Sequence, residues 1–163
     1  MNAKDVIKNN IQGGQMILGA LIEDLSDDEL FVRPAGAANH IAFQLGHLIS
    51  SERTMIDGVC PGTCPELPSG FEQTHSKENS KNDSKDGFLT KKEYLGLYQK
   101  QREATLKTLD GLPDADLDKP GPESLRQICP TVGSVFALQP LHQVWHMGQL
   151  TVLRRQLNKP VVM

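Results

Sequence analysis

The stretch TVGSVFALQPLHQVWHMGQLTVLRRQL, residues 131–157, decides the fold class. Within it, the side chains expected on one shared face recur at steps of three, four and seven, which is the spacing of one face of an α-helix. Thr131 is suited to cap this helix, which we expect to end near Asn158. Pro140 is expected to kink the helix or to split off its first turns. The residues on the shared face are Val132, Val135, Phe136, Gln139, His142, His146, Leu150, Leu153 and Leu157.

Three further segments have helical periodicity. The first runs from Asp5 to Asp24, and the second is expected from about His40 to Asp57. The third begins at Thr90, which has capping-box spacing to Glu93, and it is closed by Gly111. The sequence therefore predicts four helices.

The connections between these segments differ in length. The first connection begins with a capped turn at Ser26 and leads to Asn39, the expected N-cap of the second helix. Residues 58–90 include a Ser-, Lys-, Asn- and Asp-rich stretch from Thr74 to Gly87 with almost nothing to bury, which indicates a surface crossover. Residues 114–130 form a second irregular connection with room for a short helical turn. The expected fold is all-α, a four-helix bundle with long crossover connections, as a single domain over residues 1–163.

Composition excludes several classes of protein. The chain has 163 residues, of which 38% are hydrophobic and 23% charged, and 17 Lys and Arg against 20 Asp and Glu give a net charge of −3. This balance indicates neither disorder nor a polyanion partner, so nucleic acid is not expected. No segment approaches the ~20 apolar residues that span a bilayer, and the first residues do not resemble a signal peptide. We expect a soluble, cytoplasmic protein without a membrane partner.

Three cysteines are an odd number in a chain without an export signal, which favours reduced thiols. Cys60 and Cys64 could close a strained loop disulfide or bind a metal ion. A closed zinc site would also need His75 and Cys129 to converge on them. We therefore expect no second metal site.

His142 and His146 are four residues apart on the expected last helix, so both imidazoles project from one face. Two such histidines can simply hydrogen-bond across a bundle. Buried neutral imidazoles side by side would need partners for both ring nitrogens, however, and a metal ion satisfies one nitrogen on each. This favours a metal-binding pair.

A third ligand has to come from another helix, and the candidates are His40 and His47. They are seven residues apart, or about 10.5 Å of helix rise, so both cannot easily bind the same ion. Both lie on a mixed face of their helix, and periodicity does not choose between them. His75 falls in the polar crossover and is set aside.

Two motifs carry a resemblance to a known family. The segments NHIAFQLGHL (residues 39–48) and HQVWHMGQL (residues 142–150), the latter followed by Leu153-Arg154-Arg155, resemble the DinB-like (DinB/YfiT) family. The linker from Leu25 to Pro34 is also similar. In that family the histidine of the G-H-L segment and the H-x-x-x-H pair before G-Q form a three-histidine site for nickel or zinc. The resemblance therefore implies that His47, His142 and His146 are the metal ligands.

The same resemblance implies a four-helix protein that is often dimeric. The family is described as containing metal-dependent hydrolases and thiol-dependent transferases or isomerases. The partners expected from it are a small-molecule substrate, including a low-molecular-weight thiol, and a second copy of the chain in a homodimer.

Three neutral imidazoles leave a divalent ion with most of its charge and with open coordination positions, which is typical of catalytic sites. Our leading hypothesis is a metal-dependent thiol transferase acting on small electrophiles, because coordination lowers the pKa of a thiol. The alternatives are a metal-dependent hydrolase and a non-catalytic bundle that the ion braces. The sequence favours an enzyme without identifying its substrate.

Residues near the histidines could support such a site. Gln149 and Gln139 lie within a turn of the H-x-x-x-H pair and could orient an imidazole or a bound water. Trp145 points to another face and is expected in core packing or in a dimer contact rather than stacked on a substrate. Pocket walls are expected from the first and third helices and the crossover.

Glu52 falls within the aliphatic stripe of its helix, where an unpaired carboxylate would be costly. We expect it to pair with an arginine such as Arg33 or Arg154 rather than to act as a general base.

Overall fold

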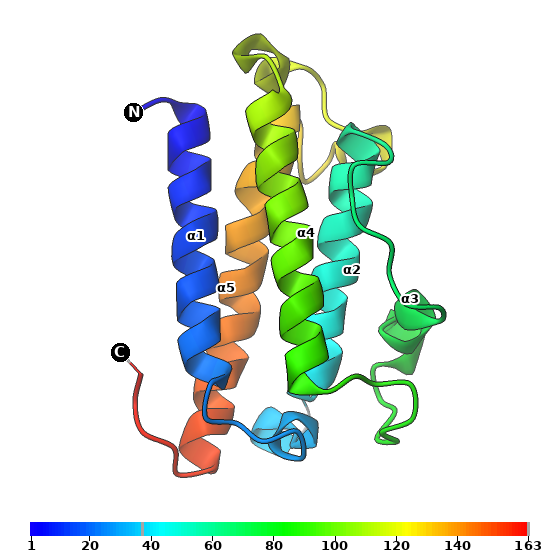
Figure 1. Cartoon of the computed structure of the whole chain (residues 1–163), viewed down its shortest axis with the longest axis vertical. Helices are drawn as coiled ribbons and strands as arrows, with labels where there is room; N and C mark the ends of the chain where they lie inside the picture. Colours follow the sequence, from blue (N-terminus) through cyan, green and yellow to red (C-terminus); the bar gives the residue numbers. More distant parts are fainter. Residues whose placement is uncertain (37, 163) are drawn as a thin grey trace.

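The computed structural model describes residues 1–36 and 38–162, and it shows four long helices packed side by side as a bundle (Figure 1). The long helices are α1 (Ala3–Ile22), α2 (Ile41–Val59), α4 (Lys91–Gly111) and α5 (Val132–Gln156). The predicted all-α bundle is confirmed, and each predicted helix agrees with the structure to within a few residues at its ends. Within the described residues, no helix is long and apolar enough to cross a membrane.

Capping side chains set the helix starts. Thr90 caps α4 and Thr131 caps α5, as predicted. The expected N-cap Asn39 is wrong by one residue, because the imidazole of His40 takes this role. Its Nδ1 accepts a hydrogen bond from the amide of Phe43 at 3.1 Å.

Helix α5 continues through Pro140, so the expectation that this proline splits off the first turns is wrong. Pro140 is buried, and the helix packs along its length against α1 and α2. This packing outweighs the one hydrogen bond that proline cannot donate. The histidine pair therefore stands on one uninterrupted helix.

Short helical turns fill the connections, as predicted for residues 26–30 and 114–130. They are η1 (Glu29–Phe31), η2 (Pro34–Gly36), α3 (Phe71–Thr74), η3 (Lys77–Asn79), η4 (Asp114–Asp118) and η5 (Glu123–Leu125).

The crossover between α2 and α4 is more buried than predicted. Phe71 and His75 are only 3% and 2% exposed, and the ring of Phe88 packs against His75 with centroids 5.2 Å apart. These side chains anchor the crossover against α2, beside which α3 lies in Figure 1. The expectation of almost nothing to bury between Thr74 and Gly87 is therefore wrong at His75.

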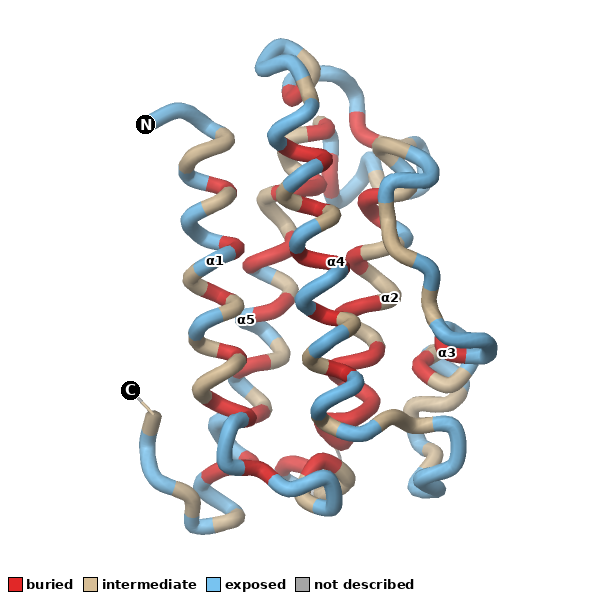
Figure 2. The backbone as a smooth tube through the Cα atoms, viewed as in Figure 1, coloured by how far each residue is buried: buried red, intermediate tan, exposed pale blue. Residues whose placement is uncertain are grey.

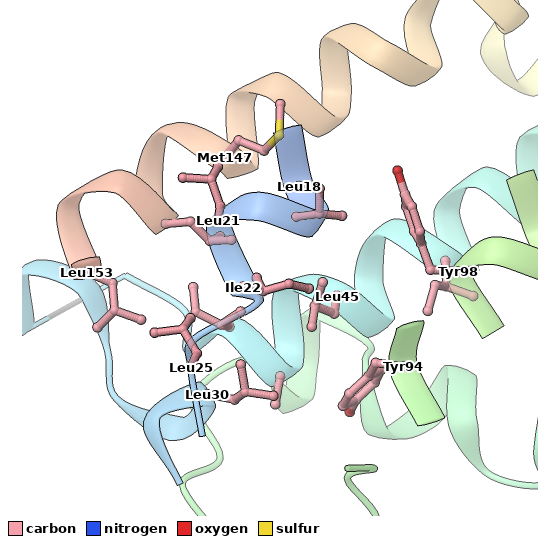
Figure 3. Close-up of a cluster of buried hydrophobic side chains, with 14 of the residues drawn as sticks. Leu18, Leu21, Ile22, Leu25, Leu30, Leu45, Tyr94, Tyr98, Met147 and Leu153 are labelled. Carbon is pink, nitrogen blue, oxygen red and sulfur yellow. The ribbon is translucent and has the colours of Figure 1, made fainter. Parts of the chain in front are cut away.

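Buried residues face inward along the four long helices (Figure 2). They form two apolar clusters at opposite ends of the bundle. One cluster, which includes Leu18, Leu45 and Met147, is drawn in Figure 3. The other includes Ile56 and Phe136. On α2, the residues between Ile49 of the first cluster and Met55 of the second are all polar, so a polar layer separates the two clusters there.

An ion pair occupies this polar layer. Glu52 of α2 and Arg102 of α4 are each 1% exposed and lie 3.0 Å apart between Oε2 and Nε. The hydroxyl of Thr105 donates to Oε1 of Glu52 at 2.6 Å, and Nη2 of Arg102 donates to Oε1 of Gln143 at 2.9 Å. Glu52 thus pairs with an arginine, as expected, but the partner is Arg102.

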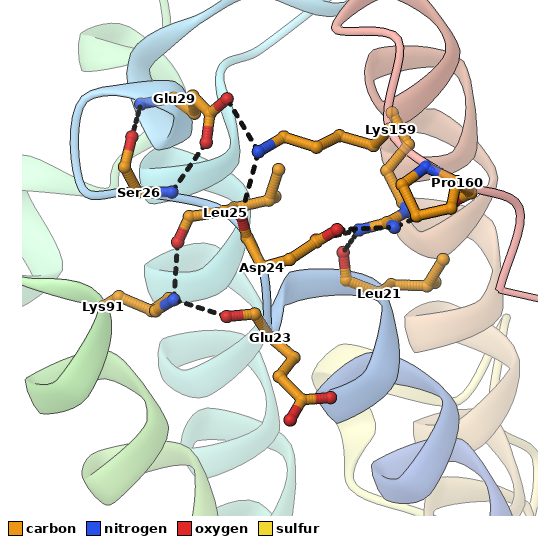
Figure 4. A network of polar contacts seen from close by, with 10 residues as sticks. Leu21, Glu23, Asp24, Leu25, Ser26, Glu29, Lys91, Lys159 and Pro160 are labelled. Atoms are coloured by element: carbon orange, nitrogen blue, oxygen red, sulfur yellow. Dashed lines mark hydrogen bonds and ion pairs between the residues drawn. The ribbon is translucent and has the colours of Figure 1, made fainter.

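The arginines suggested as partners of Glu52 are engaged elsewhere. Arg33 pairs with Asp83 at 2.8 Å. Arg154 pairs with Asp24 and donates to the carbonyl oxygen of Leu21 at 2.8 Å, within the network of Figure 4 that ties the end of α1 to α5. These contacts fix the end of the bundle beyond the histidines.

Candidate metal centre

The three histidines singled out as ligands lie together between α2 and α5. His47 is on α2, and His142 and His146 are one turn apart on α5. One ring nitrogen of each lies within 4.8 Å of the other two, and the Nε2 atoms of His142 and His146 are 3.2 Å apart. In the part of the chain that the structure describes, this is the one group of three or more His, Cys, Asp or Glu side chains that could together hold a metal ion.

Gln44 orients one of these imidazoles. Its side-chain amide donates to the carbonyl oxygen of Asn39, which leaves Oε1 as an acceptor. Nδ1 of His146 lies 3.0 Å from this oxygen and must therefore donate to it. Nε2 of His146 then carries the lone pair, and it faces His142. Such a fixed tautomer is common for histidines that bind metal ions.

A divalent ion fits this arrangement. Two nitrogens that each lie about 2.0–2.1 Å from one ion are roughly 2.8–3.4 Å apart for octahedral to tetrahedral angles. The 3.2 Å between the Nε2 atoms of His142 and His146 falls in this range. Neutral imidazole nitrogens are also suitable ligands for divalent zinc, nickel, copper or iron. The three-histidine cluster is therefore compatible with a divalent metal ion.

The environment keeps all three imidazoles neutral. Burial lowers the pKa of His142 to about 4, with His47 and Arg102 acting in the same direction. Burial and the two other histidines lower the pKa of His146 to about 4. Burial also lowers the pKa of His47. Because only the neutral form offers a lone pair, the site is ready to bind an ion near pH 7.

Two side chains of α2 pack around His47. The ring of Phe43 lies nearly parallel to the imidazole, with an interplanar angle of 5° and centroids 6.1 Å apart. The hydroxyl of Ser51 lies 3.4 Å from Nδ1 of His47. Phe43 thus contributes to the burial of the His47 imidazole, and Ser51 places a polar group beside it.

His40, the other candidate from α2, is not part of the cluster. It is fully buried at the helix start, where Nδ1 caps the helix and Nε2 lies 3.3 Å from the carbonyl oxygen of Asn82. Its ring nitrogens therefore hold the crossover and the helix end in place.

His75 lies near the three histidines, but both of its ring nitrogens are hydrogen-bonded to other groups. Its Nδ1 lies 2.7 Å from the carbonyl oxygen of Phe71, so this nitrogen donates, and Nε2 accepts from the hydroxyl of Tyr94 at 2.7 Å. The ring lies against Gly46, where the Cβ of any other residue would collide with it. The glycine before His47 therefore makes room for the crossover.

The glutamines proposed to orient the site have different contacts. The amide of Gln139 donates to the carbonyl oxygen of Val135 at 2.8 Å, within its own helix. None of the hydrogen bonds found among the described residues joins Gln139 or Gln149 to a histidine. The contact to an imidazole comes instead from Gln44, which sequence reasoning missed because its partner is on another helix.

The cysteines form no second site. Cys60, Cys64 and Cys129 are all free thiols. Within residues 1–36 and 38–162, none of them joins a group of potential metal ligands. Nε2 of Gln101 lies 3.3 Å from the sulfur of Cys64, which is half-buried.

A cavity of about 720 Å³ opens beside the cluster. Its walls come from α2, α5, the crossover and the connection before α5, so the expectation of walls from the first and third long helices is wrong. The residues lining it are His47, Ser50, Ser51, Thr54, Met55, Glu72, His75, Ser76, Lys77, Leu125, Ile128, Leu138, Leu141, His142 and Trp145. Two of the three clustered histidines therefore face a space large enough for a small molecule.

Trp145 is 77% exposed and lines this cavity. The expected role in core packing is therefore wrong. Its position three residues after His142 carried the relevant signal, since residues three apart on a helix are surface neighbours.

Comparison with protein families matches the chain to the DinB superfamily over residues 11–150. The match includes all three clustered histidines. Among curated proteins, none matches the chain significantly.

Proposed function

The chain belongs to the DinB superfamily, and we propose that it is a metal-dependent thiol transferase. In this proposal His47, His142 and His146 hold a zinc or nickel ion, and the enzyme joins a low-molecular-weight thiol to a small electrophile. The observation that carries the proposal is the cluster of three neutral imidazoles beside a cavity of about 720 Å³.

The choice of a thiol rests on what surrounds the histidines. Enzymes that activate water often use a carboxylate as general base. Among the described residues that line the cavity, the only carboxylate is Glu72, whose Oε1 lies 3.2 Å from Nη1 of Arg53. A thiolate, once formed, is itself the nucleophile and needs no further base. The wall composition therefore favours thiol transfer over hydrolysis.

The ion would supply Lewis acidity that lowers the pKa of a thiol bound to it. The protein would contribute position and surroundings. Gln44 holds the lone pair of His146 toward the cluster, and the apolar side chains of Leu138 and Leu141 cover the α5 side of the cavity. Ser51 lines the α2 side, where its hydroxyl lies 3.4 Å from Nδ1 of His47 and could bind a polar group of a substrate.

The overall reaction balances without a redox partner. The S–H bond of the thiol breaks and its proton passes to solvent. A C–S bond forms at the electrophilic carbon, and the leaving group departs with the electron pair of the bond that breaks. For chlorodinitrobenzene the products are a thioether, a proton and chloride.

The first test is elemental analysis of protein purified without a metal-chelating column, alongside the triple variant His47→Ala, His142→Ala and His146→Ala. We expect about one equivalent of metal in the parent protein and none in the variant. Thioether formation from mercaptoethanol and chlorodinitrobenzene should follow the metal content. A parent protein that cannot be loaded with zinc, nickel or cobalt would refute the metal site, and a loaded protein without transfer activity would refute the reaction.

A further inference from the structure

Trp145 is the one tryptophan in the sequence, and it stands beside the candidate centre rather than in the core. It lies on α5 three residues after His142, so the Cβ atoms of the two residues are about 5–6 Å apart. Both side chains line the same cavity. A group bound at the histidines would therefore have the indole within reach.

The cavity has two unlike walls. The α2 wall is mostly polar and includes Ser50, Ser51 and Thr54, of which Ser50 and Thr54 donate their hydroxyls to carbonyl oxygens of their own helix. Apart from His142, the wall made by α5 and the connection before it is apolar, with Leu125, Ile128, Leu138, Leu141 and Trp145. Three of these five are large apolar side chains that are mostly exposed: Ile128 at 71%, Leu141 at 66% and Trp145 at 77%.

Single exposed apolar residues are ordinary on protein surfaces, but several that converge on one concave site indicate a ligand or a partner. Here they converge on a cavity that His47 and His142 also line. A cavity with one apolar wall and other walls that are mostly polar suits a molecule with a hydrophobic body and a polar reacting end.

Building on the proposed function, we infer that this cavity selects a substrate that carries an aromatic ring, with the ring packed on Trp145 and the reacting group at the histidines. Aromatic side chains attract other rings in stacked or edge-to-face geometry, which gives the wall a preference for rings over short polar chains.

The test uses Trp145 as its own reporter, since all tryptophan fluorescence comes from this residue. Cobalt-loaded protein is titrated with phenylmethanethiol and, separately, with mercaptoethanol. Cobalt absorption reports whether the sulfur binds the ion, and because cobalt can quench fluorescence, zinc-loaded protein is used to follow the tryptophan emission. We expect both thiols to change the cobalt spectrum, only phenylmethanethiol to shift the emission, and its affinity to be at least about tenfold higher.

Two variants test whether Trp145 is responsible for the preference for the aromatic thiol. Because Trp145 is exposed, replacing it should leave the fold intact. Trp145→Ala should weaken binding of phenylmethanethiol by roughly three- to tenfold, with mercaptoethanol unchanged, as measured by cobalt absorption. Trp145→Phe should retain most of the preference for the ring.

The outcomes separate this inference from the proposed function. If cobalt binds but neither thiol changes its spectrum, the thiol chemistry fails; an emission shift with phenylmethanethiol would still support the ring-binding cavity. Equal affinities for the two thiols, or an unchanged emission while the aromatic thiol is bound, would overturn the inference. It would also be overturned if the emission depended on protein concentration without ligand, because a second copy of the chain would then cover Trp145.

Discussion

Metal binding by this protein should persist to unusually low pH, because burial lowers the pKa values of its histidines. An imidazole binds a metal ion only in its neutral form, so protons compete with the ion wherever the pKa lies above the pH. With an ordinary pKa near 6.5, an imidazole is about nine-tenths protonated at pH 5.5, which weakens metal binding about tenfold. Three ordinary histidines would together weaken it about a thousandfold between pH 7.5 and pH 5.5.

In this protein the pKa values of His142 and His146 are lowered to about 4. At pH 5.5 only about 3% of an imidazole with such a pKa is protonated, so these two contribute almost nothing to the pH dependence. His47, whose pKa is also lowered by burial, contributes at most about a tenfold weakening. The apparent dissociation constant should therefore rise less than about tenfold from pH 7.5 to pH 5.5.

The assay is competition between the protein and nitrilotriacetate for cobalt, followed by absorption and corrected for protonation of the chelator. Folding stability should also fall with falling pH. Because the pKa values of His142 and His146 are lower in the folded state, the free energy of unfolding decreases as the pH drops from about 6.5 toward 4. Circular dichroism at pH 5.5 is therefore the control for unfolding. A hundredfold or greater weakening in protein that remains folded would refute the reasoning about burial.

Two further predictions concern the side chains that hold the site. Gln44→Ala removes the acceptor that orients His146 and should weaken metal binding by about 10- to 100-fold. The matched control is Gln139→Ala, at an amide that contacts no histidine, and it should leave metal binding nearly unchanged. Equal effects of the two variants in the cobalt titration would contradict the role of Gln44 in orienting His146. Glu52→Ala leaves the charge of Arg102 buried and unpaired and should cost about 3–5 kcal/mol, lowering the Tm by roughly 10 °C in calorimetry. Replacing Glu52 by Leu and Arg102 by Met in the same protein should recover most of the lost stability. A Glu52→Ala variant as stable as the parent would show that the ion pair is not needed for stability.

The four long helices could be predicted because local patterns determine them. Apolar periodicity gave each helix face, and the hydroxyls of Thr90 and Thr131 marked two of the starts. Packing by neighbouring helices is not local, and it explains why Pro140 does not interrupt α5. The same limitation applies to the crossover, where His75 is buried by contacts to residues distant in sequence.

The partner of Glu52 left a signal in the sequence. Arg102 lies four residues after Tyr98 and three before Thr105, so it belongs to the stripe that α4 buries. Two opposite charges on the buried faces of two helices are expected to meet, because an unpaired buried charge is too costly. The expected partners Arg33 and Arg154 lie outside this stripe, which is why the expectation was wrong.

Gln44 left no such signal. Periodicity places it on a helix face, but it does not show that this face meets His146 of α5. The three histidines could be grouped from the sequence only through the family resemblance, since spacing alone did not choose between His40 and His47. The geometry distinguishes them, because His40 uses its ring nitrogens at the helix start and the crossover.

The contacts between α2 and α5 bear on whether an ion would serve structure or chemistry. Structural zinc sites are usually closed by four protein ligands, often in domains with little core of their own. Here Leu45 and Leu150 belong to one apolar cluster, and Ile56 and Phe136 belong to the other, so the two helices share apolar clusters on both sides of the histidines. An ion is not needed to join helices that are already packed in this way. Three neutral ligands beside a cavity instead match the pattern of a site that leaves coordination positions for a substrate, which is why we favour a catalytic role.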